Sequence, residues 1–199
     1  TGASSIKEVK RAYKIISKIN DKICIMQCNT NYTGSLENFK FINLNVLKEF
    51  KKIFPKVILG LSDHTPGHST VLGSIALGAR VIEKHFTYSN KANGPDHYFS
   101  MNPKTWKEMI DRSRELELSL GSKIKKVEKN ELETVIVQRR GAHLLKNMKK
   151  NEKIKKEFLN FLRPALKGSV KPYELKKVTK CKLKKKKLIG DILLWKDLK

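Results

Sequence analysis

The 199-residue chain has few cysteines, little arginine and no long apolar run. Its three cysteines, Cys24, Cys28 and Cys181, are too few and odd in number for a disulfide framework, which predicts a reducing, cytoplasmic location. Core packing explains Cys24 and Cys28 better than metal binding. No run of about 18 apolar residues occurs, so no transmembrane helix is expected. The opening, TGASSIKEVK, lacks both a methionine and the order of a signal peptide, which suggests a fragment or a processed product.

Arginine is scarce although the chain is strongly basic. The formal net charge is +24, but only seven of the 43 basic residues are arginines. Residues 1–120 carry 18 basic and 11 acidic side chains, whereas residues 121–199 carry 25 and 8. Arginine suits bidentate phosphate recognition, while lysine is a strongly hydrated surface charge. We therefore expect a lysine-coated surface and no nucleic-acid partner, with CKLKKKKL as the one candidate for an anion-attracting patch.

The first 120 residues alternate between short apolar runs and helical periodicity. Three buried strands are predicted, in residues 22–28, 56–62 and 79–86. Four helices are predicted, over residues 4–20, 38–54, 69–79 and 103–120. The last of these has Pro103 in its first turn and Gly121 just past its end. Three strands that are each followed by a helix predict an α/β fold with a parallel sheet.

The pattern changes near residue 121. The stretch GSKIKKVEKNE is expected to be a linker between two domains. Beyond it the segments are short, lack strong helical periodicity and are interrupted by prolines and glycines, which predicts a small, mainly irregular and β module. The expected division is a β/α domain over residues 1–121, a linker over 122–133 and a small domain over 134–199.

Two histidines mark the ends of neighbouring predicted strands. His64 comes just after the strand VILGLS, and His85 ends the strand RVIEKH, 21 residues further on. The carboxyl ends of parallel strands share one edge of a sheet, and the loops that leave this edge build the active site. Since adjacent strands lie about 4.8 Å apart, both imidazoles can reach one point. Two such imidazoles suit a divalent transition metal with open positions for substrate and water. The alternative is that His64 and His85 are unrelated polar residues that each end a strand.

Other polar residues are expected near the same edge. Gly94 and Pro95 predict a turn that can aim Asp96 back over the strand ends, although an aspartate in a turn is usually a local cap. The loop NTNYTGS, after the first strand, offers further polar side chains there.

Several linked motifs, GLSDHTPG, GARVIEKHFT and GPDHYFSMNPKTW, preceded by QCNTNYTGSLENFKFINLN, closely resemble the sialic acid synthase family. The tail, from VQRRGAHLLKN to GDILLWKDL, resembles that family's C-terminal antifreeze-like (SAF) module. The resemblance implies strands six to eight of a (β/α)₈ TIM barrel, followed by a small α+β or β-clip SAF domain. A full barrel takes about 250 residues, so more than half of it would lie outside this chain, and the chain alone is expected to be inactive.

The resemblance also implies an activity. Members of the family condense phosphoenolpyruvate with N-acetylmannosamine or a related amino sugar, and they release phosphate and a sialic or other nonulosonic acid. The implied cofactor is a divalent metal, Mn²⁺ or Mg²⁺, which polarises the aldehyde of the open-chain sugar. The implied assembly is a homodimer with no membrane contact.

The family's metal-binding histidines fall on His64 and His85, which the resemblance makes catalytic. Ser62 matches a serine that contacts phosphoenolpyruvate. Asp96 matches a group that holds and orients the amino sugar, so it is also expected to be catalytic. The lysines that grip phosphate and carboxylate in this family would lie in the part of the barrel outside this chain.

The loop after the first strand is also expected to bind the amino sugar. Tyr32 matches a family residue that holds the sugar. Many members have Thr-Asn-x-Tyr at this point, whereas this chain has Asn-Thr-Asn-Tyr, so Thr30 is in register and Asn31 is one place off. Arg163 matches an arginine with which the SAF module of one subunit reaches the acceptor in its partner's barrel.

Two alternatives stay open. One is another phosphoenolpyruvate-dependent sugar-acid synthase, of lipopolysaccharide or shikimate synthesis, against which the SAF-like tail argues. The other is a non-catalytic basic fragment that binds nucleic acid or anionic glycans, which would show steeply salt-dependent binding to DNA. The motifs do not distinguish among N-acetylmannosamine, its 6-phosphate and a bacillosamine-type derivative as the acceptor.

Overall fold

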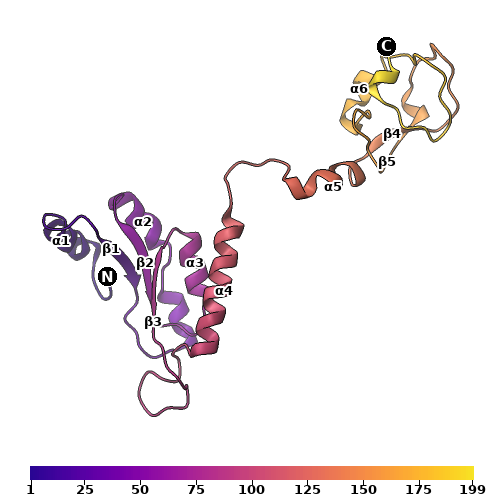
Figure 1. Ribbon diagram of the computed structural model, residues 1–199. Coiled ribbons are helices and arrows are strands. Elements are labelled where there is room, and N and C mark those ends of the chain that lie inside the picture. Colours follow the sequence, from indigo (N-terminus) through magenta and orange to yellow (C-terminus); the bar gives the residue numbers. More distant parts are fainter. The chain divides into compact units, whose positions relative to one another are not determined.

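The computed structural model describes residues 1–199 and divides them into two compact units, Thr1–Lys123 and Ile124–Lys199 (Figure 1). Each unit has its own core of buried apolar side chains. The expected domain ranges 1–121 and 134–199 fall inside these units, and the identity of each as a family module stays a prediction.

The first unit alternates strands and helices along the chain. Its strands are β1 (Cys24–Cys28), β2 (Ile58–Asp63) and β3 (Val81–Lys84). Its helices are α1 (Ile6–Ile16), the 3₁₀ helix η1 (Leu36–Phe41), α2 (Val46–Ile53), α3 (Ser69–Ala76) and α4 (Pro103–Leu120). The strands pair in parallel in the order β1-β2-β3 (Figure 1). The predicted α/β fold is therefore confirmed.

Helix α4 has the ends that its sequence predicts. The Asn102 side chain accepts a hydrogen bond from the Thr105 amide (3.0 Å), and the Thr105 hydroxyl accepts one from the Asn102 amide (3.0 Å). This reciprocal cap satisfies amide groups that the first turn leaves free. Pro103 occupies the first helical position, and Gly121 ends the helix with a φ of 49°. Local sequence therefore suffices to determine this element.

The continuous helix predicted over residues 38–54 is wrong. The segment forms η1 and then α2, which begins only at Val46. Asn43 lies between them with a φ of 51°, a left-handed conformation that cannot continue a right-handed helix. The side chain of Gln27 on β1 donates to the carbonyl of Ile42 (2.9 Å), so a contact with the sheet replaces a helical hydrogen bond.

Helices cover only one face of the sheet. Ile25 and Leu59 pack with apolar residues of α1 and α2, and Leu61 packs with residues of α3 and α4. The other face carries exposed or partly exposed side chains, those of Cys24, Met26, Cys28, Val81 and Glu83. The prediction that all three strands are buried, and that the cysteines of β1 pack in the core, is therefore wrong. Burial alternates along β1 and β3 because one face lacks a covering layer.

The second unit consists of short segments. Its strands β4 (Gly141–Leu144) and β5 (Leu159–Leu162) pair antiparallel. Its α-helices are α5 (Leu132–Val137), which begins inside the predicted linker, and α6 (Leu175–Val178). Its 3₁₀ helices are η2 (Lys129–Glu131), η3 (Lys156–Phe158), η4 (Pro172–Glu174) and η5 (Trp195–Asp197). No helix of either unit is long and apolar enough to cross a membrane.

Candidate functional site

His64 and His85 lie together at the carboxyl edge of the sheet. Asp63 of β2 pairs with Lys84 of β3, and each is followed directly by one of the histidines. The two imidazole ring centroids are 5.1 Å apart, with the ring planes at 78° to each other. Parallel pairing thus brings together two side chains that are 21 residues apart in the sequence.

His64 is oriented by a backbone contact. It is only 6% exposed, and its Nδ1 atom lies 2.8 Å from the carbonyl oxygen of Asn29, just after β1. A carbonyl oxygen can only accept, so Nδ1 is the donor in this contact, and in the neutral ring Nε2 is the nitrogen with the free lone pair. This is the tautomer that an imidazole needs in order to bind a metal through Nε2.

Asp96 faces the second histidine. Its Oδ2 atom lies 3.6 Å from Nδ1 of His85, and the two side chains are 46% and 27% exposed. The ring of Phe99 lies 5.3 Å from that of His85, measured between centroids. The loop after β3 therefore brings Asp96 back to the strand ends, as the Gly-Pro turn predicts.

Asn90 holds the loop that carries Asp96. Its Nδ2 atom donates to the carbonyl oxygens of His97 (2.8 Å) and Ser100 (2.7 Å). Its Oδ1 atom accepts from the side-chain amide of Asn102 (2.8 Å). Gly94 has a φ of 148°, and a Cβ atom there would lie 2.7 Å from the ring of His97, so only glycine fits this turn.

The loop after β1 supplies the predicted tyrosine. The ring centroid of Tyr32 lies 4.2 Å from that of His64 and 5.6 Å from that of His85. Thr30, Asn31 and Tyr32 also line an open cleft of about 570 Å³. The Asn31 side chain accepts a hydrogen bond from the Thr33 amide (3.1 Å), so it shapes the loop itself.

Ser62 and Glu83 face each other on the open side of the sheet. The Ser62 hydroxyl donates to Oε1 of Glu83 (2.7 Å). Each residue lies two positions before one of the histidines. Because side chains alternate along a strand, each lies on the same side of the sheet as that histidine. Glu83 was not among the site residues predicted from the sequence. The feature that could have identified it is a charged residue within an apolar strand, two positions before His85 and so on the same side of the chain.

The two imidazoles supply an incomplete ligand set. No three His, Cys, Asp or Glu side chains converge closely enough to hold a metal ion. Two histidine ligands leave the other coordination positions to water, substrate or residues from elsewhere. Arg163 directly follows β5 in the second unit and is exposed, and its role across a dimer stays a prediction.

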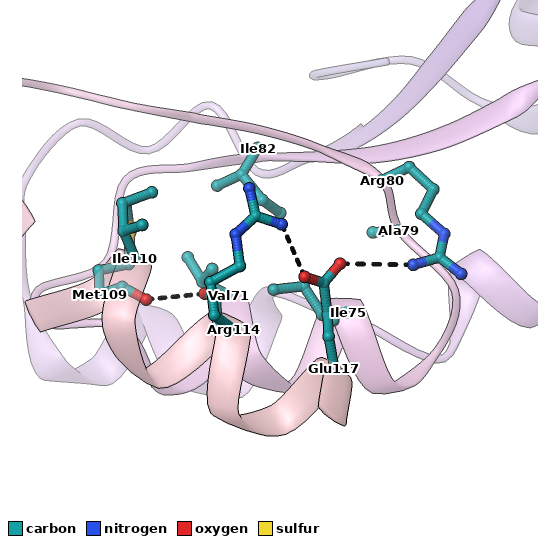
Figure 2. A pocket seen from close by; sticks show the side chains of 10 residues that line it. Val71, Ile75, Ala79, Arg80, Ile82, Met109, Ile110, Arg114 and Glu117 are labelled. Carbon is teal, nitrogen blue, oxygen red and sulfur yellow. Dashed lines mark hydrogen bonds and ion pairs between the residues drawn. The ribbon is translucent and has the colours of Figure 1, made fainter. Parts of the chain in front are cut away.

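A second hollow, of about 210 Å³, lies between α3 and α4 (Figure 2). Its walls include the apolar side chains of Val71, Ile75 and Met109. Figure 2 shows its two arginines pointing at one carboxylate: Glu117 lies 2.6 Å from Arg114 and 3.5 Å from Arg80. Arg80 directly precedes β3, so the hollow is at the opposite end of that strand from His85 and belongs to the packing between helices.

Known proteins place the chain in a family. The family model described as the NeuB family matches residues 1–125. The chain is 36% identical, over all 199 residues, to an uncharacterized protein of Methanocaldococcus jannaschii. It is 34% identical, over 177 residues, to the N,N'-diacetyllegionaminic acid synthase of Campylobacter jejuni. The chain belongs to the NeuB family. The resemblance to sialic acid synthases that the motifs indicated is thereby confirmed.

The NeuB match covers the first unit almost exclusively, since that unit ends at Lys123. The chain spans about half the length of the curated relatives: 57% of the Methanocaldococcus protein and 52% of the Campylobacter synthase, with 100% and 87% of this chain aligned. The crystal structure of an N-acetylneuraminic acid synthetase from Leptospira borgpetersenii aligns with 67% of this chain and 46% of its own, at 25% identity and a TM-score of 0.59.

Proposed function

We propose that a protein carrying this chain is a nonulosonic acid synthase, which condenses phosphoenolpyruvate with an amino sugar and releases phosphate. The observation that carries the proposal is the pair His64 and His85, whose ring centroids are 5.1 Å apart at the carboxyl edge of a parallel sheet. Membership of the NeuB family supports it, because similar proteins are named as synthases of N,N'-diacetyllegionaminic acid and N-acetylneuraminate 9-phosphate.

His64 and His85 would hold a divalent metal, Mn²⁺ or Mg²⁺, through their Nε2 atoms. The fit is supported by the Asn29 carbonyl, which accepts from Nδ1 of His64 and so leaves Nε2 as the nitrogen available to a metal. When bound, such a metal polarises the aldehyde of the open-chain sugar. Asp96, beside Nδ1 of His85, would orient that ring as well as the acceptor.

The other side chains would bind and align the two substrates. Ser62 would contact phosphoenolpyruvate, and Tyr32, Thr30 and Asn31 would line the amino-sugar site. This alignment supplies the proximity that lets the enol carbon attack the aldehyde carbon. Water then adds to the resulting oxocarbenium carbon, and phosphate leaves by cleavage of its C–O bond.

The second unit is proposed to be the family's SAF module. Its sequence similarity to that module and the exposure of Arg163 after β5 support this assignment. In a homodimer, Arg163 would donate charge-assisted hydrogen bonds to the sugar bound by the partner subunit. Residues that grip the phosphate would come from the part of the barrel that this chain does not span.

The function can be tested in a chimaera in which this chain replaces the matching segment of the Campylobacter synthase. Phosphate release from phosphoenolpyruvate is measured with N-acetylmannosamine, its 6-phosphate and a bacillosamine-type derivative. We expect release that depends on one of these sugars, and none from residues 1–199 alone. His64→Ala and His85→Ala should abolish it, while His143→Ala, in the second unit, is the matched control.

Two results would contradict the proposal. One is a folded chimaera, verified by circular dichroism, that releases no phosphate with any of the three sugars. The other is sugar-dependent release that persists when His64 and His85 are both replaced by alanine.

A further inference from the structure

We propose that the buried ion pair between Asp63 and Lys84 positions His64 relative to His85. Nζ of Lys84 lies 2.5 Å from Oδ2 of Asp63, and the two side chains are 2% and 0% exposed. Each of these residues directly precedes one histidine, and together they join the last residues of β2 and β3. The inference rests on the proposed function, because it concerns the use of the two histidines as a pair of metal ligands.

The ion pair between Asp63 and Lys84 lies on the helix-covered side of the sheet, not on the open side where the proposed substrate site lies. Successive side chains of a strand point to opposite faces, so Asp63 lies on the same side as Leu61, which packs against the helices. Ser62 and Glu83 lie on the other, open side. Asp63 and Lys84 therefore do not contact the substrates, and they act through the backbone of the histidines.

A hydrogen-bond network fixes both chain neighbours of His64. The Asp63 carboxylate accepts from the amide (3.1 Å) and hydroxyl (2.9 Å) of Thr65 and from the hydroxyl of Thr70 (2.6 Å), in the first turn of α3. Lys84 also donates to the carbonyl of Thr65 (2.7 Å). The loop that carries His64 is thus tied to α3 on one side and to β3, one residue before His85, on the other.

Stabilisation of the fold does not by itself explain why Asp63 and Lys84 form a buried ion pair. The free-energy cost of removing two charges from water offsets most of their attraction, so such a pair contributes little net stability. The second unit contains a pair of the same chemistry, in which Lys187 lies 2.7 Å from Asp197 and the side chains are 12% and 3% exposed. Neither of its residues adjoins a histidine in the sequence, so it is a matched control for the effect of losing a buried Lys–Asp pair.

The experiment measures binding of Co²⁺ alone to purified residues 1–199 by visible absorption. Co²⁺ binds imidazole more tightly than Mn²⁺ does, which suits a site with two histidine ligands. The double variant Asp63→Asn/Lys84→Met removes both charges and leaves no unpaired buried charge. We expect its Co²⁺ affinity to fall about tenfold, as when a group that orients a metal ligand is lost. Lys187→Met/Asp197→Asn should bind Co²⁺ like the wild type.

Two further variants keep the test decisive. His64→Ala measures how much Co²⁺ binding depends on the proposed site. Thr70→Val removes a single donor to Asp63 and should weaken binding roughly threefold even if the double variant does not fold. Unchanged affinity in a folded Asp63→Asn/Lys84→Met protein, or in Thr70→Val when the double variant is unfolded, would overturn the inference. If His64→Ala itself binds Co²⁺ like the wild type, the proposed metal site is wrong and the inference falls with it.

Discussion

Replacing Asn90 by alanine should release the loop that carries Asp96 without unfolding the first unit. The side chain of Asn90 makes three short hydrogen bonds, to the carbonyls of His97 and Ser100 and from the side-chain amide of Asn102, and a longer one of 3.4 Å to the carbonyl of Tyr98. Each hydrogen bond contributes about 1 kcal/mol net, so the free energy of opening the loop should fall by about 2–3 kcal/mol. That change corresponds to a loop that opens roughly 30- to 150-fold more often.

Hydrogen exchange can measure this opening. The Thr87 amide donates to the Met101 carbonyl (2.9 Å) and the Met101 amide to the His85 carbonyl (2.9 Å), so these two amides close the base of the loop. In Asn90→Ala both should exchange faster by the factor given above, while the amide of Leu61 in β2 keeps its protection. Lys91→Ala, at an exposed neighbouring position, is the control and should change neither rate.

The reasoning would be refuted in either of two ways. Unchanged exchange at Thr87 and Met101 would show that Asn90 does not hold the loop. Equally faster exchange at Leu61 would show that the substitution unfolds the whole unit, so that the loop is not an independent element.

Two further predictions concern the second unit. Burial alone would raise the pKa of Asp197, but hydrogen bonds from Lys187 and from the Leu194 amide hold that pKa below its ordinary value of 3.8. The pair's stabilisation is therefore fully present above about pH 5 and is lost progressively as the pH falls through the lowered pKa, and acid melting of Asp197→Asn should show a weaker pH dependence. If Arg163 acts as proposed, Arg163→Ala should weaken acceptor binding roughly tenfold to a hundredfold in the proposed full-length synthase. Mixing it with His64→Ala under subunit exchange should partly restore activity, and a mixture that stays inactive would exclude action across the dimer.

Features that depend on neighbouring residues were predictable from the sequence. Pro103 and Gly121 predicted the bounds of α4, because the signals that begin and end a helix lie within one turn of its ends. The order of apolar runs and helical patterns predicted a parallel sheet, and its geometry placed His64 and His85 at one edge. The linked motifs around these histidines identified the family.

Other features appeared only in the tertiary structure, because they depend on which distant segments meet. The apolar residues of β1 and β3 predict that both faces of these strands are buried. A face is buried only if another part of the fold packs on it, and helices pack on only one face of this sheet. The left-handed Asn43 accompanies a contact between Gln27 and Ile42, 15 residues apart. Asp63 and Lys84 are 21 residues apart, and only the register of β2 with β3 makes them a pair. The spacing of apolar residues in a segment indicates which of its side chains need to be buried. Which other segment covers them is decided only when the helices and strands pack together.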